Sequence, residues 1–137
     1  MMVSTKGRYA LRIMLDLAQQ EPESFVSLTS VSSRQGVSVK YMEAIVAILN
    51  RAGFVESQRG KDGGYRLRRR PAEYTIGSIL KLTEGSLAPV ACLDCEENGC
   101  DRADSCLTLP MWQHLDAIFD GYLEKVTLQD LLDGKNL

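Results

Sequence analysis

Residues 38–71 read SVKYMEAIVAILNRAGFVESQRGKDGGYRLRRRP, and this stretch decides the expected fold. Ser38 can cap a helix over about residues 39–52, because its hydroxyl can accept a backbone N–H of the first turn. Gly53 suits the end of that helix. The helix carries one apolar stripe at helical spacing, made of Met42, Ile45, Val46 and Leu49.

A predicted β-hairpin follows this helix directly. Two short segments, 54–57 and 65–68, have the composition of strands and flank a tip that is rich in glycine and in basic residues. Asp62-Gly63 is the turn dipeptide that we expect at the tip. Arg68-Arg69-Arg70 continues the basic run, and Pro71 closes the module.

The preceding residues complete a helix-turn-helix. Residues 6–20 have apolar positions at helical spacing, and Glu21-Pro22 ends that helix. Ser27 can cap a short second helix, and Gly36 suits the tight turn before the helix that starts at residue 39. A helix-turn-helix followed by a hairpin is a winged helix.

The remaining residues predict further helices. Thr75 caps a helix at about 76–84, Pro110 opens a long helix that reaches about Val126, and Thr127 caps a last short helix. The fold class is therefore mainly α with a small β-hairpin. We expect a winged helix-turn-helix DNA-binding domain in residues 1–85, and a cysteine loop with a dimerisation helix in residues 86–137.

The long helix carries a wide apolar stripe. Such a stripe favours a helix shared between two subunits, whereas the alternative is packing on its own domain. A twofold dimer would place two recognition helices one duplex turn apart and would read a palindromic operator. The stripe consists of Met111, Trp112, Leu115, Ile118, Phe119, Tyr122, Leu123 and Val126.

Charge is distributed unevenly along the 137 residues. Residues 1–70 hold 12 Lys and Arg against 6 Asp and Glu, whereas residues 71–137 hold 4 against 12. This asymmetry suggests that one end of the molecule binds a polyanion. No apolar run approaches the ~20 residues that span a bilayer. The N-terminus does not have the pattern of a signal peptide, so we expect a cytoplasmic protein without membrane contact.

Three segments are candidates for contact with double-stranded DNA. The predicted wing offers cations for a groove or for phosphates, the third helix presents its exposed first turn to base edges, and the first helix directs its N–H groups and cations at phosphate. Solvated charges are the alternative interpretation of the wing. The candidate residues are Arg59, Lys61 and Arg66 in the wing, Ser38, Lys40, Tyr41 and Glu43 in the third helix, and Ser4, Thr5, Lys6 and Arg8 in the first.

Four cysteines lie within 15 residues, at Cys92, Cys95, Cys100 and Cys106. Their clustering in one loop favours metal or redox chemistry over a disulfide framework. Four thiolates at this spacing can hold a [2Fe–2S] or a [4Fe–4S] cluster. They can also hold tetrahedral zinc, or act as a thiol switch without metal.

Several motifs resemble those of the Rrf-two family of bacterial transcription regulators, and the resemblance covers nearly the whole chain. It implies a winged-helix dimer joined by a long C-terminal helix, with the wing and the third helix on DNA. The motifs are Ser4-Thr5-Lys6-Gly7-Arg8-Tyr9-Ala10, Tyr41-Met42-Glu43, Arg59-Gly60-Lys61-Asp62-Gly63-Gly64-Tyr65-Arg66-Leu67 and Leu82-Thr83-Glu84-Gly85.

The same resemblance implies ligands for an iron–sulfur cluster. Cluster-binding members carry three cysteines before the long helix, which Cys92, Cys100 and Cys106 match with a longer first gap. Some members add a histidine where this chain has Leu109, and others an acidic residue of the partner's first helix where it has Arg8. Cys95 is the obvious substitute as fourth ligand, and His114 is a poor one.

These observations predict a dimeric DNA-binding transcription regulator, a repressor whose cysteine loop senses the iron–sulfur or redox state. The alternative is a winged-helix regulator without metal, controlled by a partner protein or by thiol oxidation. An enzyme is not expected, because His114 has no nucleophile beside it with supporting residues and no βαβ unit accompanies the cysteines.

Overall fold

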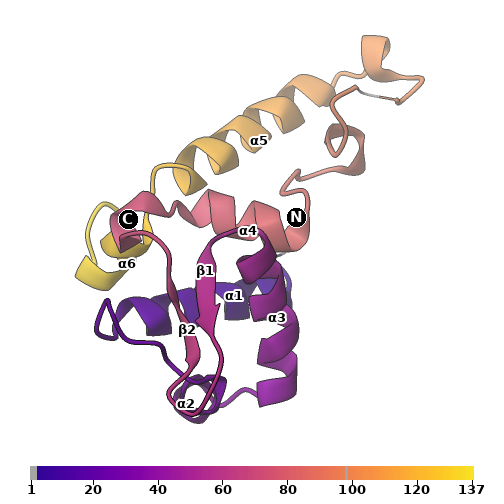
Figure 1. The fold of residues 1–137 in the computed structure, drawn as a ribbon. Coiled ribbons are helices and arrows are strands. Elements are labelled where there is room, and N and C mark those ends of the chain that lie inside the picture. Colours follow the sequence, from indigo (N-terminus) through magenta and orange to yellow (C-terminus); the bar gives the residue numbers. More distant parts are fainter. Residues whose placement is uncertain (1–2, 98) are drawn as a thin grey trace.

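The computed structural model describes residues 3–97 and 99–137, and it has the predicted mainly helical architecture with one hairpin (Figure 1). The helices are α1 (Thr5–Ala18), α2 (Leu28–Gln35), α3 (Val39–Arg51), α4 (Ile76–Glu84), α5 (Leu109–Leu123) and α6 (Leu128–Asp133). The strands are β1 (Val55–Gln58) and β2 (Gly64–Leu67), and the short 3-10 turns are η1 (Pro71–Glu73), η2 (Ala91–Leu93) and η3 (Ala103–Ser105).

Hydroxyl side chains cap the helices where the sequence predicts it. The hydroxyls of Ser27, Ser38, Thr75 and Thr127 each accept the backbone N–H of the residue three positions later, at 3.0–3.2 Å. Each bond satisfies one of the N–H groups that the first turn of a helix leaves without a partner. The four predicted helix starts are therefore confirmed.

α1 lies at the centre of the winged-helix core and packs against α2, α3, α4 and β2. The core is apolar and close-packed, and the stripe predicted for α3 is fully buried within it. Tyr74 is buried too, and its hydroxyl donates to Phe54 O at 2.6 Å and accepts the N–H groups of Arg68 and Arg69 at 3.1 and 3.0 Å. This hydroxyl joins the base of the hairpin to the residues that follow it.

β1 and β2 pair antiparallel, with Val55 opposite Leu67 and Gln58 opposite Gly64. Val26 adds an isolated antiparallel bridge to Tyr65, with both backbone hydrogen bonds at 2.8 Å. Gly64 is required there, because a Cβ at this position would lie 2.2 Å from Val26 O. The hairpin therefore rests on the segment that leads into α2.

The predicted turn at the hairpin tip is wrong by one residue. The N–H of Gly63 donates to Gly60 O at 3.1 Å, so Lys61 and Asp62 are the central residues of the turn. Positive φ is taken up by Gly60 (107°) and Gly64 (151°) at the two ends of the tip. The turn dipeptide therefore does not need a glycine at its centre.

The long helix is shorter than predicted, since α5 ends at Leu123 and not near Val126. Backbone hydrogen bonds from Ile76 N to Val126 O (2.8 Å) and from Leu128 N to Tyr74 O (3.0 Å) return the chain to the winged-helix core. Val126 and Leu128 are consequently buried in the winged-helix core, and α6 packs against η1 and α1. Val126 thus does not belong to the exposed stripe of the long helix.

α5 projects away from the winged-helix core and carries the cysteine loop at its far end (Figure 1). Lys81 of α4 anchors its near end through ion pairs with Asp120 and with Glu124, the latter at 2.8 Å. Glu124 also accepts a hydrogen bond from the hydroxyl of Thr75 at 2.9 Å. Among the helices of residues 3–97 and 99–137, none is both long and apolar enough to traverse a bilayer.

Candidate nucleic-acid interface and cysteine loop

The first turn of α3 exposes three of its four predicted DNA-contacting residues. Ser38, Lys40 and Glu43 are exposed, whereas Tyr41 is half-buried. The Tyr41 ring packs edge-on against Tyr9 of α1, with ring centroids 5.7 Å apart. This contact fixes the start of α3 on α1, which leaves the other three side chains open to a partner.

Arg59 and Lys61 lie at the tip of the wing, and both are exposed. Lys61 also lines a groove that the tip forms with Ser27 and Ser30 at the start of α2. Figure 1 shows the wing tip, α2 and the first turn of α3 together at the lower end of the molecule. The wing tip, which carries Arg59 and Lys61, and the first turn of α3 therefore lie at one end of the molecule.

Arg66 has a different environment from the two cations at the tip. Its guanidinium forms ion pairs with Glu56 at 2.6 Å and with Glu23 at 3.5 Å, and it lies 4.3 Å from the centre of the Phe25 ring. It also donates to Glu23 O at 3.0 Å. Arg66 thus ties β2 to the segment before α2, and its predicted contact with DNA remains a prediction.

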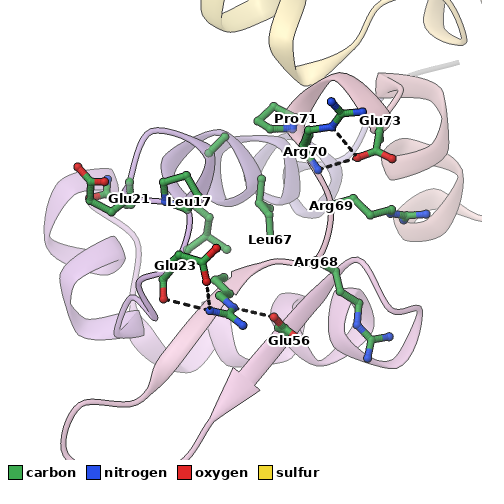
Figure 2. A pocket seen from close by; sticks show the side chains of 14 residues that line it. Leu17, Glu21, Glu23, Glu56, Leu67, Arg68, Arg69, Arg70, Pro71 and Glu73 are labelled. Carbon is green, nitrogen blue, oxygen red and sulfur yellow. Dashed lines mark hydrogen bonds and ion pairs between the residues drawn. The ribbon is translucent and has the colours of Figure 1, made fainter.

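A cavity of about 420 Å³ lies beside Arg66, between the end of α1, the wing base and η1 (Figure 2). Arginines and glutamates line its rim, and several of these charges already pair with each other, as the dashed lines in Figure 2 show for Arg70 with Glu73. Leu17, Leu67 and Pro71 form apolar parts of its wall. Among these ion pairs, those of Arg66 with Glu56 and Glu23 join the base of the wing to the segment before α2.

The start of α1 is the third predicted contact region. Thr5 and Arg8 are exposed and Lys6 is half-buried. Ser4 caps the helix, since its hydroxyl accepts the N–H of Gly7 at 3.2 Å. Ser4 therefore serves the helix itself, while Thr5 and Arg8 beside it are open to solvent.

An ion pair between a buried carboxylate and a partly exposed arginine, which sequence reasoning missed, positions α2 on α1. Asp16 is 2% exposed, and it accepts three hydrogen bonds from Arg34 at 2.7–3.2 Å and one from Gln35 at 2.9 Å. Burial alone would raise the pKa of Asp16, but the bonds from Arg34 and Gln35 hold it below its ordinary value. The signal available in the sequence was a lone acid on the apolar face of α1.

α5 presents an apolar face without a partner among the described residues. Met111, Ile118 and Tyr122 are 54%, 53% and 51% exposed and lie along one line of the helix, at intervals of seven and four residues. No residue of α5 is buried. Exposed apolar surface of this kind marks a site of association.

The loop before α5 contains the four predicted ligands. Cys92 and Cys106 are half-buried, Cys95 and Cys100 are exposed, and Cys92, Cys95 and Cys106 carry free thiols. Within residues 3–97 and 99–137, no three His, Cys, Asp or Glu side chains form a group that could hold a metal ion. The donor chemistry fits an iron–sulfur cluster or zinc, but the described loop has no ready-made site.

Cys106 has the most distinctive environment of these thiols. Its sulfur lies 3.3 Å from the hydroxyl of Thr108, just before α5 begins. The Thr108 hydroxyl, and then the backbone N–H groups of Thr108 and Leu109, lower the pKa of the Cys106 thiol. Leu109, where the resemblance would place a histidine ligand, is the first residue of α5, and His114 is exposed on the same helix.

The amino-acid sequence matches, over residues 3–134, a family model described as Rrf2, iron-dependent transcriptional regulator. The HTH-type transcriptional regulator IscR of Serratia proteamaculans is 35% identical over 137 residues, which cover 100% of this chain and 82% of that protein. CymR, the global cysteine regulator of B. subtilis, superposes with a TM-score of 0.79 at 35% identity over 99% of both chains. IscR of T. potens superposes with a TM-score of 0.79 at 37% identity, over 98% of this chain and 88% of that one.

Proposed function

Because this chain belongs to the Rrf2 family of transcriptional regulators, we propose that it acts as a cytoplasmic homodimer that represses genes by binding a palindromic operator. The family and its named relatives are regulators and not enzymes, as the sequence predicts. Three parts of the molecule would serve this function. The wing, α3 and the start of α1 would bind DNA, α5 would join the subunits, and the cysteine loop would receive a signal.

The observation that carries the DNA-binding surface is the gathering of exposed polar and basic side chains at one end of the winged helix. Arg59 and Lys61 at the wing tip have no ion-pair partner within the described residues, in contrast to Arg66. Free cations can neutralise phosphates and release counterions. The exposed Glu43 can accept a hydrogen bond from a cytosine amino group in the major groove.

The proposed dimer rests on the apolar face of α5. Pairing this face with the same face of a second copy would remove its side chains from water, at roughly 25 cal/mol per Å² of apolar surface. A twofold arrangement would present two wings and two α3 helices to successive turns of a duplex. A palindromic operator follows from that symmetry.

The DNA-binding proposal is tested with a duplex of about 30 base pairs, selected from a random pool by the wild-type protein, over a series of salt concentrations. Arg59→Ala should weaken binding and reduce the slope of log K against log salt by about one, since one phosphate contact is lost. Lys135→Ala removes an exposed cation from the C-terminal end and is the matched control. Equal slopes for wild type and Arg59→Ala would remove the wing from the interface.

We propose that the cysteine loop is the sensing element and that it folds around an iron–sulfur cluster. Cys92, Cys100 and Cys106 would be ligands, and Cys95 is the candidate for the fourth position. Metal binding by a loop without a ready-made site is coupled to the folding of that loop. Zinc binding and reversible thiol oxidation are the competing chemistries.

Anaerobic purification followed by absorption spectra and by iron, sulfide and zinc analysis distinguishes these chemistries. Iron with equimolar sulfide and visible absorption supports a cluster, and stoichiometric zinc without colour rejects it. If neither metal is present, mass spectrometry after mild oxidation reports whether the thiols pair. Cys95→Ser separates a four-thiolate cluster, which it would destabilise, from a three-thiolate one with a different fourth ligand.

A further inference from the structure

The first turn of α1 is held by a residue of another helix. The backbone N–H of Ser4 donates to Glu84 Oε1 at 3.1 Å, and the Ser4 hydroxyl donates to the same oxygen at 2.5 Å. Glu84 is the last residue of α4, 80 positions further along the chain. Two hydrogen bonds thus join the start of α1 to the end of α4.

This arrangement replaces a familiar local motif. In a capping box, a glutamate at the third helical position accepts the N–H of the N-cap residue. In α1 the N-cap is Ser4, the third position is Gly7, and the first turn has no acidic residue. Glu84 accepts the N–H of Ser4 in place of the missing glutamate, so the motif is completed between two helices.

Gly7 makes room for the carboxylate. A Cβ at position 7 would lie 2.2 Å from Glu84 Oε1 and 3.1 Å from a methyl group of Val3. Gly7 is buried, and its φ is not in the left-handed region, so backbone conformation does not require a glycine here. The absence of a side chain at position 7 allows Glu84 to reach Ser4.

We infer that Glu84 is a positioning residue for DNA binding: it orders the first turn of α1, which presents Thr5, Lys6 and Arg8 to phosphate groups. The inference rests on the proposed function, because it requires that the start of α1 faces the duplex. Glu84 itself need not touch DNA. It fixes the backbone from which the contacting side chains extend.

The charge of Glu84 acts in the opposite direction to its hydrogen bonds. A carboxylate near a helix N-terminus stabilises the helix by interacting with its dipole, but it repels a phosphate that approaches the same end. Loss of ordering weakens DNA binding, whereas loss of repulsion strengthens it. Two substitutions of Glu84 separate the two effects.

Both hydrogen bonds end on one oxygen, so a glutamine can accept both while it removes the charge. Glu84→Gln should therefore bind the selected duplex of about 30 base pairs at least as tightly as wild type, with the same salt slope. Glu84→Ala removes the oxygen and should bind about three- to tenfold more weakly, with a slope lower by about one. Equal or tighter binding by Glu84→Ala would overturn the inference.

Gly7→Ala tests the same contact without changing Glu84. The added methyl displaces the carboxylate from Ser4, while alanine is a better helix former than glycine. DNA binding should fall as in Glu84→Ala, although the urea midpoint of unfolding stays equal or rises. If Glu84 served only the stability of the fold, the DNA affinity of Gly7→Ala would instead stay equal or rise together with its urea midpoint.

Two further variants identify which statement fails. Lys6→Ala should lower the salt slope by about one if α1 faces DNA. An unchanged slope there overturns both the contact and the inference, whereas a lowered slope with wild-type behaviour of Glu84→Ala and Gly7→Ala overturns the inference alone. Thr127→Ala removes a comparable cap from α6 and should leave the slope unchanged.

Discussion

The winged-helix core and the projecting helix α5 contain apolar stripes that look similar in the sequence, but the two stripes differ in what covers them. Among the described residues, every buried apolar side chain lies in residues 10–87 or 126–128, and α5 has none. The stripe of α3 is covered by α1, α2, α4 and β1, whereas Met111, Ile118 and Tyr122 in the stripe of α5 are exposed in the single chain. An apolar stripe therefore predicts burial, but it does not say which partner provides it.

The largest expected effect comes from a substitution in the winged-helix core. Leu49→Ala removes a fully buried side chain from α3 and should lower the free energy of unfolding by about 2–5 kcal/mol, since a cavity remains. Urea denaturation at fixed protein concentration measures the change. Asn50→Ala, at the exposed neighbouring position, should change it by less than about 0.5 kcal/mol.

A substitution on the exposed face of α5 should change dimer association and not the stability of the monomer fold. Ile118→Asp places a charge in the exposed apolar face of α5 and should raise the dissociation constant of the dimer at least about 100-fold, which corresponds to about 2.7 kcal/mol. Sedimentation equilibrium measures it, with Gln113→Asp on another face of the helix as control. A dimer of unchanged affinity would assign the α5 face to another partner.

An intermediate effect concerns the Asp16–Arg34 ion pair that joins α1 and α2. Arg34→Met leaves the Asp16 carboxylate with Gln35 alone and should cost about 1–3 kcal/mol at pH 7, a range reduced because Arg34 is 42% exposed. Urea unfolding at pH 7 would contradict this expectation if both proteins had the same midpoint.

The same pair predicts a pH dependence. Since the pKa of Asp16 is lowered in the folded state, its carboxylate stabilises the fold above the unfolded-state pKa of about 4. This contribution is lost as the pH falls through the lowered folded-state pKa. Arg34→Met should therefore show a shallower loss of stability below pH 4 than wild type, and parallel curves would argue against the hydrogen bonds as the cause.

The smallest expected effect lies in the cysteine loop. Because the Thr108 hydroxyl and nearby backbone N–H groups lower the pKa of Cys106, its thiolate is more abundant at neutral pH. Thr108→Val should slow the alkylation of Cys106 by iodoacetamide about two- to fivefold at pH 7, as followed by peptide mass spectrometry. Ser105→Ala, whose hydroxyl donates to Arg102 O, is the matched control.

Local features were predictable because they depend on neighbours in the chain. Ser27, Ser38, Thr75 and Thr127 cap helices through bonds that span three residues, and the stripe of α3 follows from helical periodicity. The hairpin was predicted for the same reason. Its turn was displaced by one residue, because two glycines outside the predicted dipeptide take up the positive φ values.

Features that join distant segments were not predictable. Asp16 pairs with a residue 18 positions away, and Glu84 caps a helix that begins 80 positions earlier. Val126 was assigned to the stripe of the long helix, but two backbone hydrogen bonds near Thr75 and Thr127 return it to the core. Periodicity cannot show such pairings, since their partners are brought together only when the chain folds.

The sequence by itself determined the helices, the wing and the family, because capping, periodicity and motifs are written in adjacent residues. Only the tertiary structure decided which charges are free and which are paired, so that Arg59 is available to a ligand while Arg66 is held by Glu56 and Phe25. The physical reason is that burial and pairing are properties of a three-dimensional neighbourhood. The same residue type acquires a different role in each one.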